Sequence, residues 1–169
     1  MSSRHTTIDS PLGELTLTAQ GDFLTGIFYE GHWHFPPSEY FGERVSAEES
    51  LFTHTEAQLQ EYLGGQRTTF DVPLETHGNP FQERVWERLK HIPYGETASY
   101  GQLAGELGDP NLAQAVGSAV GRNPISVIIP CHRVVGRNGQ LTGYAGGLPN
   151  KRFLLELEEP AVVREGKLF

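Results

Sequence analysis

The length, composition and charge of the chain exclude several classes of protein. Its 169 residues, 37% hydrophobic and 20% charged, are typical of a folded chain with one large domain or two small ones. The polar start from Met1 to Ser10 and the lack of any run of roughly 20 apolar residues predict neither a signal peptide nor a membrane span. A single cysteine excludes an internal disulfide and a zinc site of several thiolates, so we expect a cytoplasmic setting.

The net charge of −8 is unevenly distributed along the chain. Residues 1–78 carry three arginines against twelve acidic residues, a net charge of −9, whereas residues 79–169 carry ten basic and nine acidic residues, a net charge of +1. The second part can therefore approach phosphates without large repulsion, and the first cannot. This balance permits nucleic-acid binding but does not indicate it, because such surfaces usually carry a clear excess of Lys and Arg.

The first part of the chain predicts strands followed by a helix. Apolar, aromatic and β-branched runs predict strands over 6–9, 14–18 and 23–29, and Pro11 and Gly13 suit a tight turn between the first two. The segments after these strands are a loop over 31–46, a helix over 47–63, a strand over 68–72 and a linker over 75–80.

The second part predicts mostly helices. An apolar stripe predicts a helix over 81–89, and Ser99 can cap a short helix that reaches Leu107. A turn containing glycine and proline separates this helix from another over 112–122, as in a helix-turn-helix. The second of these helices is rich in Ala, Gly and Ser, which suits either close helix packing or close approach to a DNA groove.

Short elements complete the prediction. A β-branched run over 125–130 predicts a buried strand, and an Asn-Gly pair predicts a small hairpin over 134–141. A glycine-rich loop over 142–147 precedes a final helix that starts at Pro149. Together these elements predict an α+β fold with a small N-terminal α/β domain over 1–78 and a mostly helical C-terminal domain over 79–169.

The single cysteine has two interpretations. A lone cysteine is most often a small buried hydrophobic residue, but Cys131 stands at the end of a predicted strand and is followed by His132 and Arg133. A thiol with a pKa of about 8.5 needs a base or a nearby positive charge to act as a nucleophile at neutral pH. His132 can help only if the chain turns at Cys131, since neighbouring residues of a strand face opposite sides, and Pro130 makes such a turn plausible.

A series of motifs favours the second interpretation, a reactive Cys131. The segment IPCHRV at 129–134 resembles the active-site signature of the O6-alkylguanine-DNA alkyltransferases, also called methylated-DNA–protein-cysteine methyltransferases. Further blocks resemble the same family in the same order: FQERVW at 81–86, IPYGET at 92–97, RNP at 122–124, GYAGG at 143–147 and KRFLLE at 151–156. The resemblance covers nearly all of residues 79–158 and implies a ribonuclease H-like N-terminal domain followed by a winged helix-turn-helix domain.

The resemblance assigns roles to five residues around the cysteine. Cys131 matches the alkyl acceptor, His132 the base that takes the thiol proton through a water, and Glu158 the carboxylate that orients the histidine. Asn123 matches the asparagine that links the recognition helix to the active-site strand. Tyr100 matches the tyrosine that supports base rotation and donates a hydrogen bond to the departing guanine.

The resemblance also implies how DNA and the damaged base are bound. The main chain at Cys131 and Val134 and the loop residues Tyr144, Ala145 and Gly146 would surround the base. The residues of the recognition helix expected against DNA are Gln114, Ala115, Ser118 and Arg122. Gln114 departs from the family pattern, because an arginine usually fills the place of the flipped base at this position.

The implied reaction is the irreversible transfer of an alkyl group from the O6 atom of a flipped guanine to Cys131, once per molecule and without a cofactor. The expected partner is double-stranded DNA containing O6-alkylguanine, bound by a monomer, and cooperative binding along DNA is left open. Two other functions remain as alternatives. A non-catalytic alkyltransferase-like lesion-binding protein would lack Cys131, and a cysteine hydrolase would need an oxyanion-hole motif that the sequence does not contain. His32 and His34 suggest a metal only weakly, so we expect none.

Overall fold

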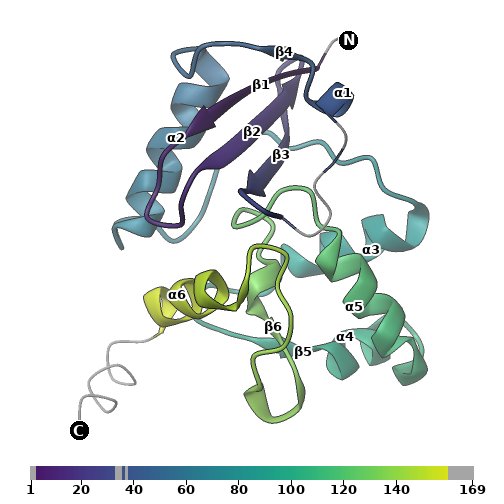
Figure 1. The fold of residues 1–169 in the computed structure, drawn as a ribbon. Helices are drawn as coiled ribbons and strands as arrows, with labels where there is room; N and C mark the ends of the chain where they lie inside the picture. Colours follow the sequence, from purple (N-terminus) through teal and green to yellow (C-terminus); the bar gives the residue numbers. More distant parts are fainter. Residues whose placement is uncertain (1–2, 33–35, 37, 160–169) are drawn as a thin grey trace, which may run out of the picture.

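The computed structural model describes residues 3–32, 36 and 38–159. A small sheet and one long helix form the N-terminal half, and short helices dominate the C-terminal half (Figure 1). This arrangement confirms the predicted α+β class. None of the described helices is long and apolar enough to cross a membrane. The last ten residues of the predicted second domain, 160–169, lie outside the described part of the chain.

The N-terminal sheet has the strand order β3-β2-β1-β4. Strands β1 (Ser3–Ile8), β2 (Leu15–Gln20) and β3 (Phe23–Tyr29) form an antiparallel meander, which confirms the three predicted strands. The turn after β1 needs a glycine at its end, because Gly13 has a φ of +96° and its N–H donates to the Ser10 carbonyl. The sheet therefore forms largely from local pairing.

Helix α2 (Ser50–Leu63) lies beside this sheet (Figure 1). Its buried Phe52 and Leu59 belong to the same apolar core as Leu15 and Leu17 of β2. The predicted helix is confirmed, although it begins three residues later than expected, at Ser50 rather than at residue 47.

Two predictions for the N-terminal half are wrong. The predicted loop over 31–46 contains the short helix α1 (Ser38–Phe41) and strand β4 (Glu43–Arg44), which pairs in parallel with β1. The predicted strand over 68–72 is absent, and the nearest strand-like pairing with the sheet is a bridge between Leu24 and Leu74 just after it. The N–H of Asp71 donates instead to the side chain of Gln58 on α2, so a side chain takes the hydrogen bond that a neighbouring strand would have made.

The outer edge of β3 joins the two halves of the chain. Ile27 forms a parallel bridge with Ile125, and its N–H donates to the Pro124 carbonyl at 2.9 Å. The predicted strand over 125–130 is buried as expected but makes only this one bridge, and then turns. Val127 within it has a φ of +74°, a strained conformation for a β-branched residue. The segment that leads to Cys131 is thus a compact turn braced against the sheet.

The C-terminal half contains the predicted helices. Their bounds are α3 (Pro80–Leu89), α4 (Tyr100–Glu106), α5 (Ala113–Gly121) and α6 (Leu148–Glu158), with the 3₁₀ helix η1 (Pro110–Leu112) between α4 and α5. Ser99 caps α4 as predicted by accepting a hydrogen bond from the N–H of Gln102. The indole N–H of Trp86 on α3 donates to the Ala119 carbonyl at 2.8 Å and so ties α3 to α5.

The predicted hairpin over 134–141 is wrong in its pairing. Strand β6 (Val134–Val135) pairs in parallel with β5 (Ala98–Ser99) instead of folding back on residues 140 and 141. The Asn-Gly turn itself is present as the 3₁₀ helix η3 (Arg137–Gly139), with Asn138 at a φ of +60°. Hydrogen bonds from the Gly136 N–H to the Gln140 carbonyl and from the Gly139 N–H to the Gly136 carbonyl close this turn, while β6 pairs with β5.

The start of α3 gives a test of the local structure. Asn79 accepts from the Gln82 N–H, and the Gln82 side chain accepts from the Asn79 N–H, which forms a capping box. We expect Asn79→Ala to lower the free energy of unfolding by about 1 kcal/mol, because donors at the helix start lose their partner. Chemical denaturation measures this loss. Asn111→Ala is the control, since Asn111 is exposed and lies inside η1 rather than at an N-cap; an equal loss in both variants would contradict the capping role.

Candidate active site

Cys131 is the first residue of a 3₁₀ turn, η2 (Cys131–Arg133), and its side chain is buried. The turn at Cys131 that cooperation with His132 requires is therefore present, and Pro130 stands immediately before it. Asn123, which follows α5, holds this segment through both ends of its amide. Its Nδ2 donates to the Ile129 carbonyl at 2.8 Å, and its Oδ1 accepts from the Ile125 N–H at 3.0 Å.

The surroundings of the thiol keep it protonated at rest. Burial raises the pKa of Cys131, and hydrogen bonds with the Asn123 and Tyr144 side chains and the charge of Lys151 oppose this rise without cancelling it. Lys151 on α6 is itself buried, and its ammonium group donates to the Thr142 and Gly143 carbonyls. Burial lowers the pKa of Lys151 to about 8. A base is therefore needed to generate the thiolate.

His132, the next residue of the turn, is the candidate for that base. Its Nε2 lies 2.9 Å from Oε2 of Glu158, and both side chains are almost fully buried. Burial lowers the pKa of His132 below the ordinary 6.5, so the ring is neutral at neutral pH. Because the ionised Glu158 can only accept, the ring proton stays on Nε2. The remaining nitrogen, Nδ1, is buried and has no hydrogen-bond partner among the described residues, so it is free to accept a proton.

Glu158 is surrounded by donors. Arg133 contacts both carboxylate oxygens at 2.8 Å, and its third nitrogen donates to the Ile92 carbonyl at 2.6 Å. The hydroxyl of Tyr62 on α2 also donates to Oε2 of Glu158 and lies 3.4 Å from Nε2 of His132. Burial disfavours the ionised Glu158, but the hydrogen bonds and charges of His132 and Arg133 outweigh it and lower its pKa to about 2.

Sequence reasoning missed three groups of this site. In the sequence, Tyr62 fits the helical spacing of the apolar residues of α2, and Tyr29 looks like an ordinary aromatic residue of β3. Lys151 appears in the sequence only as part of a helix motif. None carries a local signal, because each meets the site through contacts between distant segments. Arg133 is visible in the sequence as a positive charge close to the cysteine, but its contact with Glu158 is not.

A small cavity lies beside this cluster. It has a volume of about 100 Å³ and is lined by Tyr100, Gly117, Val120, Gly121, Gly143, Tyr144 and Ala145. Three predicted site residues, Tyr100, Tyr144 and Ala145, therefore meet at one cavity. Val134 is buried in β6, where its N–H donates to the Cys131 carbonyl, and Gly146 packs against the ring of Tyr29; neither lines the cavity. The hydroxyl of Tyr100 accepts a hydrogen bond from Thr142 at 3.4 Å.

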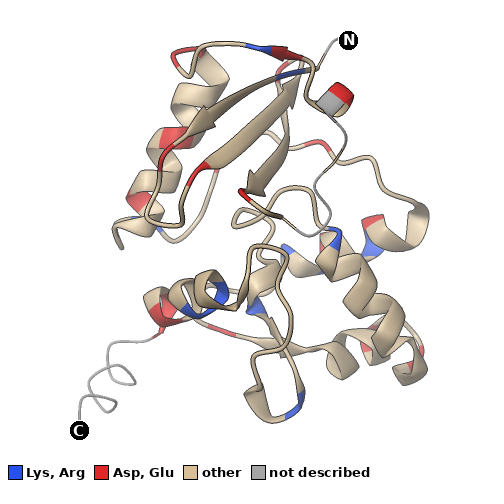
Figure 2. Ribbon diagram, in the orientation of Figure 1, with Lys and Arg blue, Asp and Glu red and all other residues tan. Residues whose placement is uncertain are grey.

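The four residues predicted to meet DNA lie on one face of α5 and just beyond its end. Gln114, Ala115, Ser118 and Arg122 all lie at least partly exposed there. The opposite face buries Val116, Ala119 and Val120. Helix α5 itself contains no charged residue, whereas acidic residues are spread over the N-terminal half (Figure 2). The exposed face is thus uncharged and built mostly of small side chains, with one arginine at its end.

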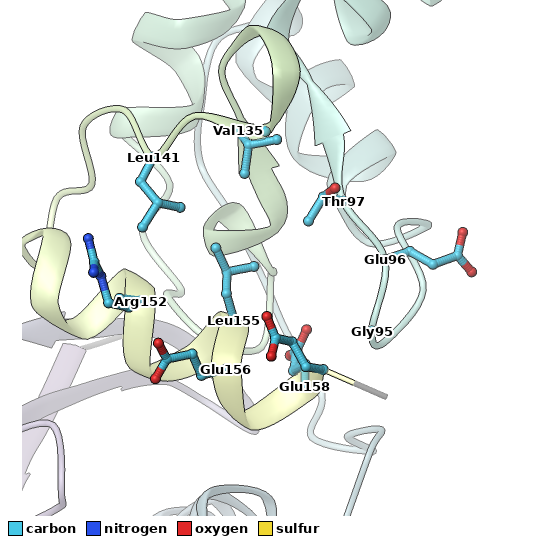
Figure 3. Close-up of a pocket in the computed structure, with 11 residues that line it drawn as sticks. Gly95, Glu96, Thr97, Val135, Leu141, Arg152, Leu155, Glu156 and Glu158 are labelled. Atoms are coloured by element: carbon cyan, nitrogen blue, oxygen red, sulfur yellow. The ribbon is translucent and has the colours of Figure 1, made fainter. Parts of the chain in front are cut away.

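A second pocket lies between α6 and the β5–β6 pair (Figure 3). It has a volume of about 430 Å³, and Glu96, Leu141, Arg152, Leu155 and Glu158 are among the residues that line it. Cys131 and His132 are not, so this pocket does not lead to the thiol.

The structure offers no metal site within the described residues, where no group of three or more His, Cys, Asp or Glu side chains is suitably placed. His32 is buried, and its Nδ1 accepts from the N–H of Tyr29 at 3.3 Å. Trp33 and His34 lie outside the described residues.

The fold and the site together define a protein with a buried cysteine nucleophile, served by a histidine–carboxylate pair. A family model for the "6-O-methylguanine DNA methyltransferase, ribonuclease-like domain" matches residues 3–76, and one for the "6-O-methylguanine DNA methyltransferase, DNA binding domain" matches residues 80–160. The chain belongs to the 6-O-methylguanine DNA methyltransferase family.

Individual relatives agree with this assignment. A methylated-DNA–protein-cysteine methyltransferase of Mycobacterium tuberculosis is 45% identical over 163 residues, 96% of each chain. The constitutive enzyme of that name from Bacillus subtilis is 41% identical, over 91% of this chain and 94% of its own. The crystal structure of Mycobacterium tuberculosis OGT in complex with DNA superposes with a TM-score of 0.85 at 47% identity, covering 92% of each chain.

The pairing of His132 with Glu158 can be tested directly. Because the carboxylate raises the pKa of His132 while burial lowers it, we expect His132 to titrate below 6.5 and Glu158→Gln to lower its pKa further. NMR titration of the ring resonances measures both values. Glu156→Gln is the control, since Glu156 lies on the same helix and makes no contact with the ring. An unchanged His132 titration in Glu158→Gln would refute the electrostatic pairing.

Proposed function

We propose that this protein repairs DNA by transferring an alkyl group from O6 of guanine to Cys131. The observation that carries the proposal is the buried thiol next to the neutral His132, whose ring is held by Glu158 and whose Nδ1 has no hydrogen-bond partner in the described part of the chain. The names of the relatives, methylated-DNA–protein-cysteine methyltransferases, support the same reaction.

The chemistry follows from the protonation states. Nδ1 of His132 takes the thiol proton through a bridging water, and the ionised Glu158 stabilises the imidazolium that forms. Arg133 keeps Glu158 ionised, so the carboxylate does not take up the proton itself. The sulfur then attacks the alkyl carbon, the carbon–O6 bond breaks and guanine leaves with the bonding electron pair. Overall, the thiol proton passes by way of His132 to the departing guanine. The thioether has no route back, so each molecule reacts once and needs no cofactor.

The base must leave the duplex to reach the sulfur. We propose that it enters the cavity between Tyr100 and the loop at Tyr144 and Ala145, whose far wall is α5. Tyr100 hydrogen-bonds the departing guanine. The carbonyls of Cys131 and Val134, which lie outside the lining of this cavity, would have to come within reach of the exocyclic amine as the base enters. Gly146 belongs to the same base-binding loop, and Asn123 keeps the cysteine segment in register with α5.

Helices α4 and α5 act in this proposal as a helix-turn-helix that places the exposed face of α5 against DNA. The small residues Ala115 and Ser118 allow close approach, Arg122 contacts a phosphate and Gln114 fills the gap left by the flipped base. We further propose that residues 1–78 and 79–169 are two domains and that the protein acts as a monomer, because one chain supplies every group of the site. A cytoplasmic location would keep its single thiol reduced.

The acceptor role of Cys131 is tested by intact mass measurement after incubation with duplex DNA containing O6-methylguanine. We expect the protein to gain one methyl group and Cys131→Ser to gain none while still binding the DNA, because a serine hydroxyl is too weakly acidic for this base. A mass gain on another residue would overturn the assignment. Binding without any gain would identify a lesion-binding protein, and repeated turnover a hydrolase.

The role of Gln114 is tested by comparing two substrates. An arginine there would add a charged hydrogen bond to the orphaned cytosine, so we expect Gln114→Arg to speed repair of duplex DNA on the order of tenfold. Reaction with free O6-alkylguanine base should hardly change, because the free base needs no flipping. Gln66→Arg adds the same charge on the N-terminal half and serves as the control. Equal acceleration of both substrates would contradict a role in flipping.

A further inference from the structure

We propose that Tyr29, from the N-terminal sheet, is a positioning residue that aims the hydroxyl proton of Tyr144 at the sulfur of Cys131. The inference rests on the proposed function and extends it, because it gives the N-terminal half a part in the transfer step. Tyr29 is the last residue of β3, which pairs along its length with β2.

The geometry of Tyr29 is tightly fixed. Its side chain is 1% exposed, and its hydroxyl oxygen lies 2.7 Å from that of Tyr144. The two rings meet edge to face with centroids 5.6 Å apart, and His32 stacks on the ring of Tyr29 at 5.9 Å. The main chain of Tyr29 exchanges hydrogen bonds with His32 in both directions. Tyr29 is thus a rigid support rather than a loosely packed aromatic residue.

The loop that carries Tyr144 rests directly on this support. A Cβ atom placed on Gly146 would overlap the ring of Tyr29, so no other residue fits there without a shift of the ring or the loop. Glycine at this position therefore lets the loop backbone lie flat against the ring. The contact fixes the loop two residues from Tyr144, whose side chain also lines the small cavity.

The hydrogen bonds continue from Tyr144 to the thiol. A hydrogen-bonding interaction with the Tyr144 side chain lowers the pKa of Cys131, and the Tyr144 hydroxyl contacts that of Tyr29, so the order of the chain is Tyr29, Tyr144, sulfur. Burial raises the pKa of both tyrosines, and both hydroxyls therefore stay protonated. A hydroxyl has one proton to donate. If Tyr29 donates to the oxygen of Tyr144, the proton of Tyr144 is left for the sulfur, and this order becomes more favourable as the sulfur gains negative charge.

Other titratable groups also face Cys131. They are Tyr100 from α4 and Lys151 from α6, and His132 follows Cys131 directly in the chain. Tyr29 also lies near enough to Cys131 to interact with it electrostatically, but its hydroxyl contacts that of Tyr144. Removal of the Tyr29 hydroxyl leaves Tyr100, Lys151 and His132 in place, so comparison with the loss of the Tyr144 hydroxyl tests whether the effect passes through the hydrogen-bond chain.

The test uses Tyr29→Phe, which keeps the ring against Gly146 and removes the hydroxyl. We expect single-turnover transfer from free O6-benzylguanine to slow roughly fivefold to tenfold near neutral pH, as for the loss of one hydrogen bond close to a charged atom. The difference in rate between the wild type and the variant should shrink at high pH, because the substitution raises the pKa of Cys131 and does not move its side chain. Tyr40→Phe is the matched control, since its hydroxyl bonds Thr25 elsewhere in the same half of the chain.

A second measurement does not depend on activity. The chain has one cysteine, so one ¹³Cβ cysteine resonance reports the thiol titration. We expect its midpoint to rise in Tyr29→Phe and in Tyr144→Phe, with no further rise in the double variant, because both changes break the same chain. Additive shifts, an unchanged midpoint, or a rate loss equal at every pH would overturn the proposal. A wild-type protein that transfers nothing would instead refute the proposed function, and the titration would still decide whether Tyr29 acts on the thiol.

Discussion

The site depends above all on the neutralisation of one buried carboxylate, that of Glu158. A buried charge is costly unless its oxygens are well supplied with donors. The donors here come from separate parts of the chain: His132 and Arg133 from η2, and Tyr62 from α2. Satisfying Glu158 therefore fixes the position of α6, of the cysteine turn and of the N-terminal helix at once. The two halves of the protein share a polar core as well as an apolar one.

The same arrangement explains how a reactive residue can be unreactive at rest. The thiol is buried, and its raised pKa keeps it protonated. In the proposed reaction the thiol becomes reactive only when the ring of His132 takes its proton, and burial keeps that ring neutral and able to accept it. Stray oxidants and electrophiles that do not fit beside Tyr144 meet a thiol rather than a thiolate, which suits a group that can be used only once.

The sequence predicted well whatever depends on local pattern. The strand over 23–29 coincides with β3, and Ser99 caps α4 as expected. The predictions that failed, over 68–72 and 134–141, did so because a side chain of α2 or another strand took the backbone hydrogen bonds. The motif at 129–134 pointed to the cysteine and histidine. Tyr62, however, lies 70 residues before His132, and Tyr29 lies 115 residues before Tyr144, the residues whose side chains they contact. Nothing local separates them from ordinary core aromatics.

The uneven charge of the chain has a physical consequence for encounters. A body with −9 on one half and +1 on the other experiences a torque near a polyanion, because its acidic end is repelled more strongly than its neutral end. Rotation brings the weakly charged half forward before contact is made. The acidic sheet and α2 thus orient the protein before contact, and a larger share of its collisions with a polyanion involves the half that contains the reactive cysteine.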